Sequence, residues 1–316
     1  MEDMKKQEGE KQMYDIIIIG SGPAGLAAAI YAGRAKRKAL VLESAPMSGG
    51  QIINTYEVDN YPGIEGISGF ELGQKMRQHA DRMEVPFLMT EVLSVEKGED
   101  CKLVRTKDEV LESRTVIFAT GATYRKLGVP GEESLRGLGV SYCATCDGAF
   151  FRGRTVAVVG GGDVALEDAL FLARGCEKVY LIHRRDSFRG AKVLQEQVMA
   201  QERIEILYDT EVTSIGGTES VSDITIFNKK KEEQKKLAVQ GVFLAVGITP
   251  ASELANGLVE LDENGYIIAG EDCAASVPGI YAAGDVRTKQ LRQVVTAVSD
   301  GANAVTSAER YLNGQQ

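Results

Sequence analysis

Long apolar runs, an excess of positive charge and proline are scarce or missing in this sequence. It has no run of about 18 apolar residues, so no helix is expected to span a bilayer. Its 45 acidic residues outnumber the 36 lysines and arginines, and the formal net charge of -9 gives no electrostatic reason to bind nucleic acid or an anionic membrane. The first residues, MEDMKKQEGEKQM, are charged rather than signal-like, so we expect a cytoplasmic protein.

Only 7 prolines stand against 35 glycines, and this excess of glycine indicates nucleotide-binding loops rather than disorder. A chain of 316 residues exceeds one typical core, so two domains are expected. Residues 1–13 lack apolar periodicity and are predicted to form a flexible tail.

Cysteine is also sparse, with five residues and no secretory signal, which excludes a disulfide framework. Only Cys143 and Cys146 have C-x-x-C spacing, which suits a redox pair because it lets a disulfide close within one turn and can lower a thiol pKa. Zinc would need a second C-x-x-C or suitably spaced histidines, and neither follows, so no metal is expected. The isolated residues Cys101, Cys176 and Cys273 are expected to be small buried hydrophobic residues.

The first glycine motif, GSGPAG, spans Gly20–Gly25 and follows a predicted buried strand at Asp15–Ile19. A helix is predicted to start near Pro23, so the loop can bring backbone N–H groups and a helix N-terminus to a pyrophosphate. Glu43 ends the next predicted strand, where it can accept hydrogen bonds from a ribose and would repel a 2′-phosphate. This site therefore favours FAD or NAD over NADP, and the later Gly49-Gly50-Gln51, Asn60 and Gly284-Asp285 favour FAD.

A second copy of this unit begins with a strand at Thr155–Val159 and continues into Gly160-Gly-Gly162-Asp-Val-Ala165. At the ribose position it carries a histidine and three arginines: His183, Arg184, Arg185 and Arg189. Guanidinium groups bind a 2′-phosphate through charge-assisted hydrogen bonds, so this site is predicted to bind NADPH. A solvated basic turn without a ligand remains the alternative.

Three further strands are predicted at residues 116–119, 242–245 and 280–283, each followed by glycine, and a last helix at about 293–311. Their order predicts an α/β fold with two Rossmann-like domains, in which the NADPH domain is inserted into the FAD domain. The FAD domain would comprise residues 14–124 and 253–316, and residues 125–252 would form the NADPH domain with the C-x-x-C pair. The charged run KKKEEQKK at 229–236 is predicted to be an exposed hairpin tip.

Together the motifs CATCDG, GSGPAG, GGGDVALEDA, HRRDSFR and AAGD closely resemble those of the low-molecular-weight bacterial thioredoxin reductases, over residues 14 to about 312. The cysteine pair lies shortly before the second glycine motif, as in that family, whereas glutathione-reductase-like relatives carry it after the first. The resemblance implies a homodimer that passes electrons from NADPH through FAD to the cysteine pair and then to thioredoxin. It implies that Cys146 faces the flavin, that Cys143 attacks the partner and that Asp147 transfers the proton. A helix-capping aspartate is the alternative for Asp147.

The resemblance also implies two sets of cofactor contacts. The FAD contacts would be Gly20, Ser21, Gly22, Pro23, Ala24, Gly25, Glu43, Gly50, Gln51, Asn60, Val92, Thr120, Gly121, Gly284, Asp285, Arg292, Gln293 and Val294. The NADPH contacts would be Gly160, Gly162, Asp163, Val164, Ala165, His183, Arg184, Arg185, Arg189 and Val246.

Two residues depart from the family pattern. Leu138 stands where several relatives have arginine, which affects how strongly charge would hold thioredoxin, and Asp163 replaces a more usual asparagine near the nucleotide phosphates. Two alternatives to thioredoxin reduction stay open. One is a flavoprotein that oxidises dithiols with oxygen, which should not need the arginine cluster. The other is a reductase of another C-x-x-C partner, such as a glutaredoxin-like protein or a peroxidase system.

Overall fold

The computed structural model describes residues 13–55, 58 and 60–314. The tail predicted for residues 1–13 lies outside these residues except for Met13, which begins the first strand. The chain divides into two compact units. Unit 1 contains the residues up to Thr123 and those from Thr249 onward, and unit 2 contains Tyr124–Ile248.

Unit 1 is built on a seven-stranded sheet in the order β3-β2-β1-β6-β5-β4, with β17 paired to β6. The strands β1, β2, β3, β6 and β17 run parallel, while β4 and β5 are antiparallel additions. Their bounds are β1 Met13–Ile19, β2 Ala39–Glu43, β3 Phe87–Met89, β4 Val92–Lys97, β5 Lys102–Thr106, β6 Val110–Phe118 and β17 Ile280–Ala282. The helices are α1 Pro23–Arg34, α2 Gly69–Asp81 and α6 Val294–Leu312, with short 3₁₀ turns η1 Gly50–Asn54 and η3 Glu253–Ala255.

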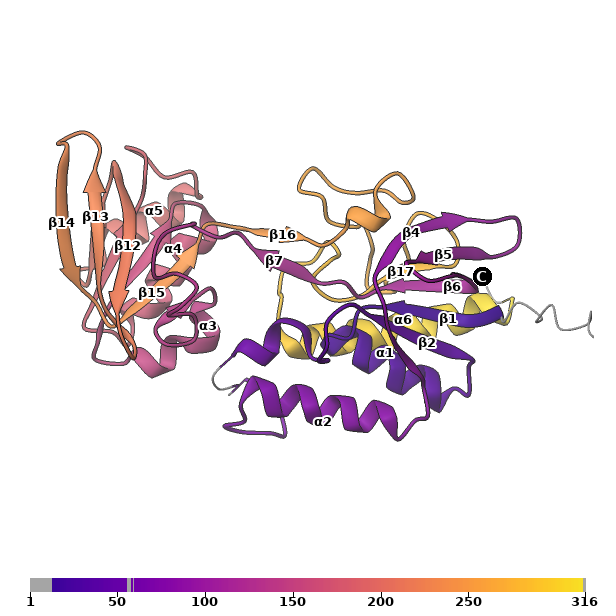
Figure 1. Cartoon of the computed structure of the whole chain (residues 1–316). Helices are drawn as coiled ribbons and strands as arrows, with labels where there is room; N and C mark the ends of the chain where they lie inside the picture. The colour runs from indigo at the N-terminus through magenta and orange to yellow at the C-terminus, as the bar shows by residue number, and fades with distance from the viewer. Residues whose placement is uncertain (1–12, 56–57, 59, 315–316) are drawn as a thin grey trace, which may run out of the picture. The chain divides into compact units, whose positions relative to one another are not determined.

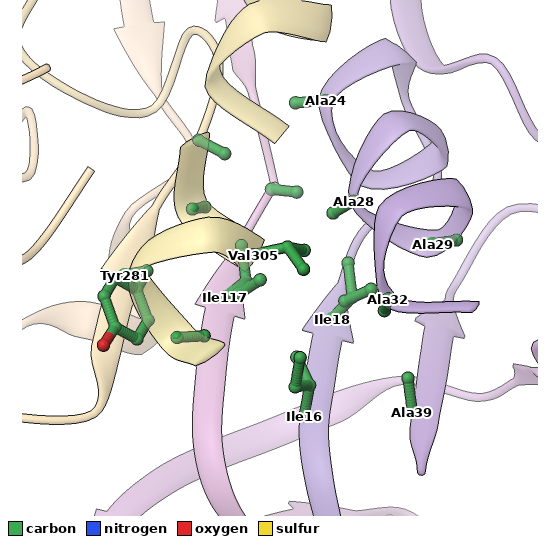
Figure 2. Packing of buried hydrophobic residues seen from close by; sticks show 14 of the residues in the cluster. Ile16, Ile18, Ala24, Ala28, Ala29, Ala32, Ala39, Ile117, Tyr281 and Val305 are labelled. Atoms are coloured by element: carbon green, nitrogen blue, oxygen red, sulfur yellow. The ribbon is translucent and has the colours of Figure 1, made fainter. Parts of the chain in front are cut away.

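Successive residues of β1 face opposite sides of this sheet, which explains why all four residues of its buried part, Ile16–Ile19, are apolar. Ile16 and Ile18 pack under α1 and α6, whereas Ile17 and Ile19 enter the core on the other face. Figure 2 shows the first of these cores, where Ala28 and Ala32 of α1 and Val305 of α6 meet the strand side chains. Small alanines let α1 lie close to the sheet, which places the start of this helix at the carboxyl ends of β1 and β2.

Unit 2 has a parallel five-stranded sheet in the order β11-β10-β9-β15-β8 and a separate antiparallel sheet β12-β13-β14. The strands are β8 Val140–Ser141, β9 Thr155–Gly160, β10 Lys178–Ile182, β11 Ile204–Leu207, β12 Thr210–Gly217, β13 Val221–Asn228, β14 Glu233–Ala238 and β15 Gly241–Ala245. The helices are α3 Ala144–Asp147, the 3₁₀ turn η2 Gly148–Phe151, α4 Asp163–Ala173 and α5 Lys192–Met199. Helices α4 and α5 cover one face of the parallel sheet, and β12–β14 pack on the other (Figure 1).

Two short strands, β7 Ala122–Tyr124 and β16 Ile248–Pro250, pair with each other where the chain passes from one unit to the other and back. The predicted strands and glycine turns are confirmed, and so is the α/β fold class. The charged run at 229–236 covers the turn after β13 and the exposed first half of β14, so it is a hairpin tip as predicted. Among the described helices, none combines the length and apolar character needed to cross a membrane.

Candidate functional site

The first glycine loop is fixed to the sheet by its own backbone. Gly20 has a φ of +107° and donates its N–H to the carbonyl of Leu42 at 2.8 Å. A side chain at Gly20 would strike the carbonyl of Ala119, and one at Gly25 would strike the carbonyl of Gly20. Glycine is required at both positions because strand, loop and helix approach one another this closely.

The same loop leaves an open cradle for a phosphate. Gly22 is the N-cap of α1, and no side chain caps the helix start or places an acid in its first turn. Gly50 faces it, because a Cβ at Gly50 would lie 3.1 Å from the Cα of Gly22. Ser21 is buried and its carbonyl accepts the N–H of Gly49 at 2.8 Å, which joins the two glycine segments. Uncapped N–H groups and the helix dipole are suited to a pyrophosphate.

Glu43, at the end of β2, is buried and already has two partners. Its carboxylate accepts the hydroxyl of Ser48 at 2.7 Å and pairs with Arg77 of α2 at 2.9 Å. The Arg77 guanidinium also lies 3.6 Å from the ring centroid of Phe87. A carboxylate can accept about four hydrogen bonds, so Glu43 keeps capacity for a ribose. Arg77 was missed from the sequence, since nothing in its helix indicates which strand it reaches.

Other predicted FAD contacts lie along the edges of the same unit. Gln51 donates its amide to the carbonyl of Ala122, and Thr120 donates its hydroxyl to the carbonyl of Ala251. The side chain of Asn60 donates to that of Gln293 at 3.0 Å, immediately before Val294 begins α6. These bonds join η1 to β7, the segment after β6 to the segment after β16, and Asn60 to the residue before α6. Val92 lies at the start of β4 and is half-buried, and no described contact joins it to the others.

The Gly284-Asp285 turn follows β17, and Gly284 has a φ of +81°. Among the described side chains, Oδ1 of Asp285 and Nε of Arg292 are buried without a hydrogen-bond partner. Burial raises the pKa of Asp285, although Lys289 and Arg292 lower it in part. Arg292 lies over the ring of Tyr266, 4.2 Å from the centroid. Buried polar atoms are normally paired, so this turn fits a polar ligand such as the ribityl chain and pyrophosphate of FAD.

A buried ionic cluster supports that turn and was not predicted. Asp300 of α6 accepts the N–H of Gly284 at 2.9 Å and pairs with Arg287 and Lys289, each at 2.7 Å. Burial alone would raise the pKa of Asp300, but the bonds from Arg287 and Lys289 hold it below its ordinary value. Asp300 is therefore the side chain that locks the glycine-aspartate turn to the last helix.

In unit 2 the second glycine loop repeats the first with one difference. Gly160 approaches Ala165 so closely that a Cβ at Gly160 would lie 2.6 Å from the Cβ of Ala165, which explains the small third residue. A side chain at Gly161 would collide with the ring of His183. Nothing lies within 4 Å of a Cβ built on Gly162, the N-cap of α4, so that side of the loop is open. Val164, the second residue of α4, is exposed.

The arginine turn is held against this loop by its backbone. The N–H of Arg189 donates to the carbonyl of Gly161 at 2.8 Å, and the N–H of Ala191 donates to the carboxylate of Asp163 at 2.6 Å. The unusual Asp163 thus anchors the turn. The side chains of Arg184, Arg185 and Arg189 are exposed, and no acid of the described residues lies within ion-pair distance of them. This favours a phosphate site over a solvated turn of no function.

His183 has a different role from its arginine neighbours. Its ring is buried under the glycine loop and Nε2 lies 3.0 Å from the carbonyl of Ser187. Burial, together with the charges of Arg185 and Arg189, lowers the pKa of His183. A neutral ring that packs the arginine turn is therefore indicated. Val246 lies after β15 and packs against the core between the parallel sheet and β12–β14. No described contact joins it to the arginine turn.

Cys143 and Cys146 form a disulfide, with their Cα atoms 5.3 Å apart. Cys143 is the N-cap of the short helix α3, whose last residue is Asp147. Asp147 is the N-cap residue of η2, but its carboxylate makes no capping bond there and instead accepts the hydroxyl of Ser141 at 2.6 Å. Its Oδ1 is buried without a partner among the described residues, and burial raises its pKa against the opposing effect of Ser141.

The isolated cysteines differ from one another. Cys176 and Cys273 are buried, as predicted, whereas Cys101 is only half-buried. Burial, followed by the charge of Asp300, raises the pKa of Cys273 to about 12. Both buried thiols are therefore poor nucleophiles near neutral pH.

Comparisons with known proteins find similarity over nearly the whole chain. Residues 14–301 match the family model for pyridine nucleotide-disulphide oxidoreductases. A thioredoxin reductase of Mycolicibacterium smegmatis is 48% identical over 305 residues, which cover 96% of this chain and 98% of that protein. One from Bacillus subtilis (strain 168) is 41% identical over 97% of both chains.

A solved structure is also similar. The crystal structure of thioredoxin reductase from Streptococcus pyogenes MGAS5005 has a TM-score of 0.92 and 44% identity, covering 96% of this chain and 100% of that chain. These findings confirm the resemblance drawn from the motifs. The chain belongs to the pyridine nucleotide-disulphide oxidoreductase family, in which its similar relatives are thioredoxin reductases.

Proposed function

We propose that this protein reduces the disulfide of thioredoxin with electrons from NADPH, through FAD and the Cys143–Cys146 pair. The observation that supports this most strongly is the Cys143–Cys146 disulfide itself, carried by the unit that also holds the second glycine loop and the arginine turn. A redox pair beside a pyridine-nucleotide site needs an electron carrier between them, and unit 1 offers a site that fits FAD. The two relatives named above are both thioredoxin reductases, and the similarity to this chain covers nearly their full length.

The two units divide the binding of cofactors. In unit 1 the cradle of Gly22 and Gly50, Glu43 and the Asp285 turn would hold FAD. In unit 2 the loop at Gly160–Gly162 would hold the pyrophosphate of NADPH, and the three arginines would hold its 2′-phosphate. FAD, when bound, supplies the chemistry that turns a hydride from NADPH into two electrons for the disulfide.

The chain's own residues would complete the reaction. Reduction of the pair leaves two thiols, of which Cys143 would attack the partner disulfide and Cys146 would resolve the mixed disulfide. Asp147 would hold and transfer the proton, because a buried carboxyl with a raised pKa suits proton transfer near neutral pH. The disulfide bonds formed and broken balance, and the partner leaves as a dithiol.

The homodimer and the cytoplasmic location belong to the same proposal. Both are what the family resemblance implies. Light scattering of the purified flavoprotein should give twice the mass of the chain, and fractionation of the cells of origin should place the protein with the soluble cytoplasmic markers. A monomer in solution would contradict the homodimer, and recovery with the membrane fraction would contradict the cytoplasmic location.

One assay tests the function as a whole. The purified yellow protein should be bleached by NADPH without oxygen, and should then support thioredoxin-dependent reduction of a chromogenic disulfide. Thioredoxin is the expected partner, with a glutaredoxin-like protein as the comparison substrate. Bleaching without turnover on thioredoxin would contradict the substrate, and rapid consumption of oxygen with small dithiols would favour a dithiol oxidase.

A further inference from the structure

Ser141 ends the strand that leads into the redox loop, and its hydroxyl contacts both Cys143 and Asp147. It is the last residue of β8, which pairs with β15 at Phe243, and only 6% of it is exposed. Its position two residues before Cys143 places its hydroxyl at the base of the redox loop. The backbone N–H of Cys143 donates to this hydroxyl at 3.1 Å.

The same hydroxyl donates to Oδ2 of Asp147 at 2.6 Å. Such a short O–H···O contact is typical of a bond to a charged acceptor. Ser141 therefore connects the backbone of the attacking cysteine to the carboxyl group that transfers the proton. The hydroxyl accepts from Cys143 and donates to Asp147, and the carbonyl of Cys143 at 3.3 Å is a longer, competing acceptor for the same proton.

The environment of Asp147 makes this bond important. Burial raises the pKa of Asp147, and the only side-chain bond found to oppose that rise comes from Ser141, while Oδ1 has no partner among the described residues. A donor bonded to the ionised carboxylate stabilises it, so loss of the donor must raise the pKa further. The hydroxyl also fixes which oxygen of the carboxyl group is left free, and this free oxygen is the one available to exchange a proton.

We propose that Ser141 is a positioning residue for dithiol exchange, which orients the carboxyl group of Asp147 and sets how tightly it holds its proton while it fixes the backbone of Cys143. This rests on the proposed function, since it assigns a task to Asp147 in that reaction. Ser141 itself touches neither the partner nor a cofactor in this scheme.

The exchange balances with a single shuttle. Protonated Asp147 stands beside the Cys143 thiolate, and attack on the partner disulfide forms a mixed disulfide and expels one partner thiolate, which takes the proton from Asp147. Asp147 then accepts the proton of Cys146 as its sulfur attacks the Cys143 sulfur. This second attack forms the internal disulfide and expels the second partner thiolate, which takes that proton. Two electrons and two protons leave the enzyme, and the partner becomes a dithiol.

The test measures the protonation of Asp147 directly, in the oxidised holoenzyme without thioredoxin. Carbon-13 NMR of labelled aspartate carboxyl groups follows the titration, and Asp147→Asn identifies the signal by its loss. Ser141→Ala should move the titration midpoint of Asp147 to higher pH, and Ser141→Thr, which keeps the hydroxyl, should leave it near the wild-type position. If the alanine variant does not retain FAD, Ser141→Gly makes the same removal.

Thr210→Val is the matched control, because Thr210 is a buried hydroxyl of the same unit that donates to the carbonyl of Tyr208 at 2.6 Å, with no described contact to Asp147. In Thr210→Val, the titration midpoint of Asp147 should equal that of the wild type. In turnover with thioredoxin, the pH at which the rate titrates should rise in Ser141→Ala by the same shift as the NMR midpoint.

The outcomes separate the two proposals. An unchanged or lowered Asp147 midpoint in Ser141→Ala would overturn the role of Ser141, whatever the substrate is. A raised midpoint in a protein that does not reduce thioredoxin would keep that role and remove the proposed substrate. A uniform fall in rate at every pH, with no shift in the midpoint, would show that Ser141 only supports the fold.

Discussion

The hydroxyl of Tyr142 donates a hydrogen bond of 2.7 Å to Glu132, which joins the residue just before Cys143 to the first loop of unit 2. The buried Glu132 carboxylate also accepts the backbone N–H groups of Leu127 at 2.9 Å and Gly128 at 2.6 Å. The Tyr142 ring stacks on Tyr124, with centroids 5.0 Å apart. The redox loop is thus attached to the segment where the chain enters unit 2.

Tyr142→Phe should destabilise unit 2 while keeping the ring stack. It removes one hydrogen bond to a buried carboxylate, a change of about 1.5 to 3 kcal/mol. The thermal unfolding midpoint should therefore fall, whereas Glu133→Gln, at an exposed neighbour, should change it little. An unchanged midpoint in Tyr142→Phe would show that the bond is not needed.

Replacement of Arg184 and Arg189 by alanine should raise the KM for NADPH at least tenfold and leave that for NADH nearly unchanged. Charge-assisted bonds to a phosphate are worth about 1.5 to 3 kcal/mol each, and NADH has no 2′-phosphate. Steady-state kinetics with both cofactors measures this. The control is the double variant Arg154→Ala/Arg174→Ala, which removes two exposed arginines of the same unit. Equal loss with both cofactors would mean that the cluster is structural.

The two cysteines should differ in what they trap. Cys146→Ser keeps the attacking thiol without a resolving partner, so a thioredoxin with one activated cysteine should accumulate as a mixed disulfide with Cys143. Cys143→Ser should form no such complex and should show a long-wavelength band from the Cys146 thiolate beside FAD. Both variants should still be reduced by NADPH. Cys101→Ser should behave as the wild type, and mass spectrometry that finds the crosslink at Cys146 would reverse the assignment.

Asp168 of α4 should make unit 2 less stable as the pH rises. Burial, followed by the charge of Glu167, raises the pKa of Asp168 to about 7. A raised pKa means that the folded state binds the proton more tightly, so this contribution is full below the ordinary aspartate range and is lost as the pH rises through about 7. Asp168→Asn should therefore raise the thermal unfolding midpoint relative to wild type more at pH 8 than at pH 5. Thermal unfolding of both proteins at the two pH values measures this. An equal effect at both pH values would show that Asp168 ionises normally.

Asp300→Asn should loosen the turn that is proposed to hold FAD. It leaves the cations of Arg287 and Lys289 buried without a full counter-charge, which typically costs about 3 to 5 kcal/mol. We expect a lower unfolding midpoint and faster loss of flavin on dilution, measured by the fluorescence of released FAD. Asp81→Asn, which breaks an exposed pair with Arg77, should cost less than about 1 kcal/mol. Flavin retention equal to wild type in Asp300→Asn would separate the cluster from the FAD site.

The sequence by itself determined the features that depend on short spacing. An apolar run that ends in glycine predicts a strand and a phosphate loop, because backbone sterics act within a few residues, and β1 with Gly20 follows that rule. Cys143 and Cys146 lie three residues apart, so their pairing needs no knowledge of the rest of the fold. The position of the arginine turn relative to its glycine loop was also predictable, since the repeating unit places it at the end of the second strand.

Only the tertiary structure decided which distant side chains meet. Arg77 reaches Glu43 because α2 packs against α1 and η1, and Asp300 reaches Arg287 because α6 packs against β17. Ser141 is six residues from Asp147, a spacing typical of no single element, and the two meet because β8 ends where α3 turns back. Such contacts depend on strand register and helix packing, which are set by the burial of whole cores. Local sequence patterns do not determine register or packing. The redox pair was therefore predictable, and the Ser141 hydroxyl that positions it was not.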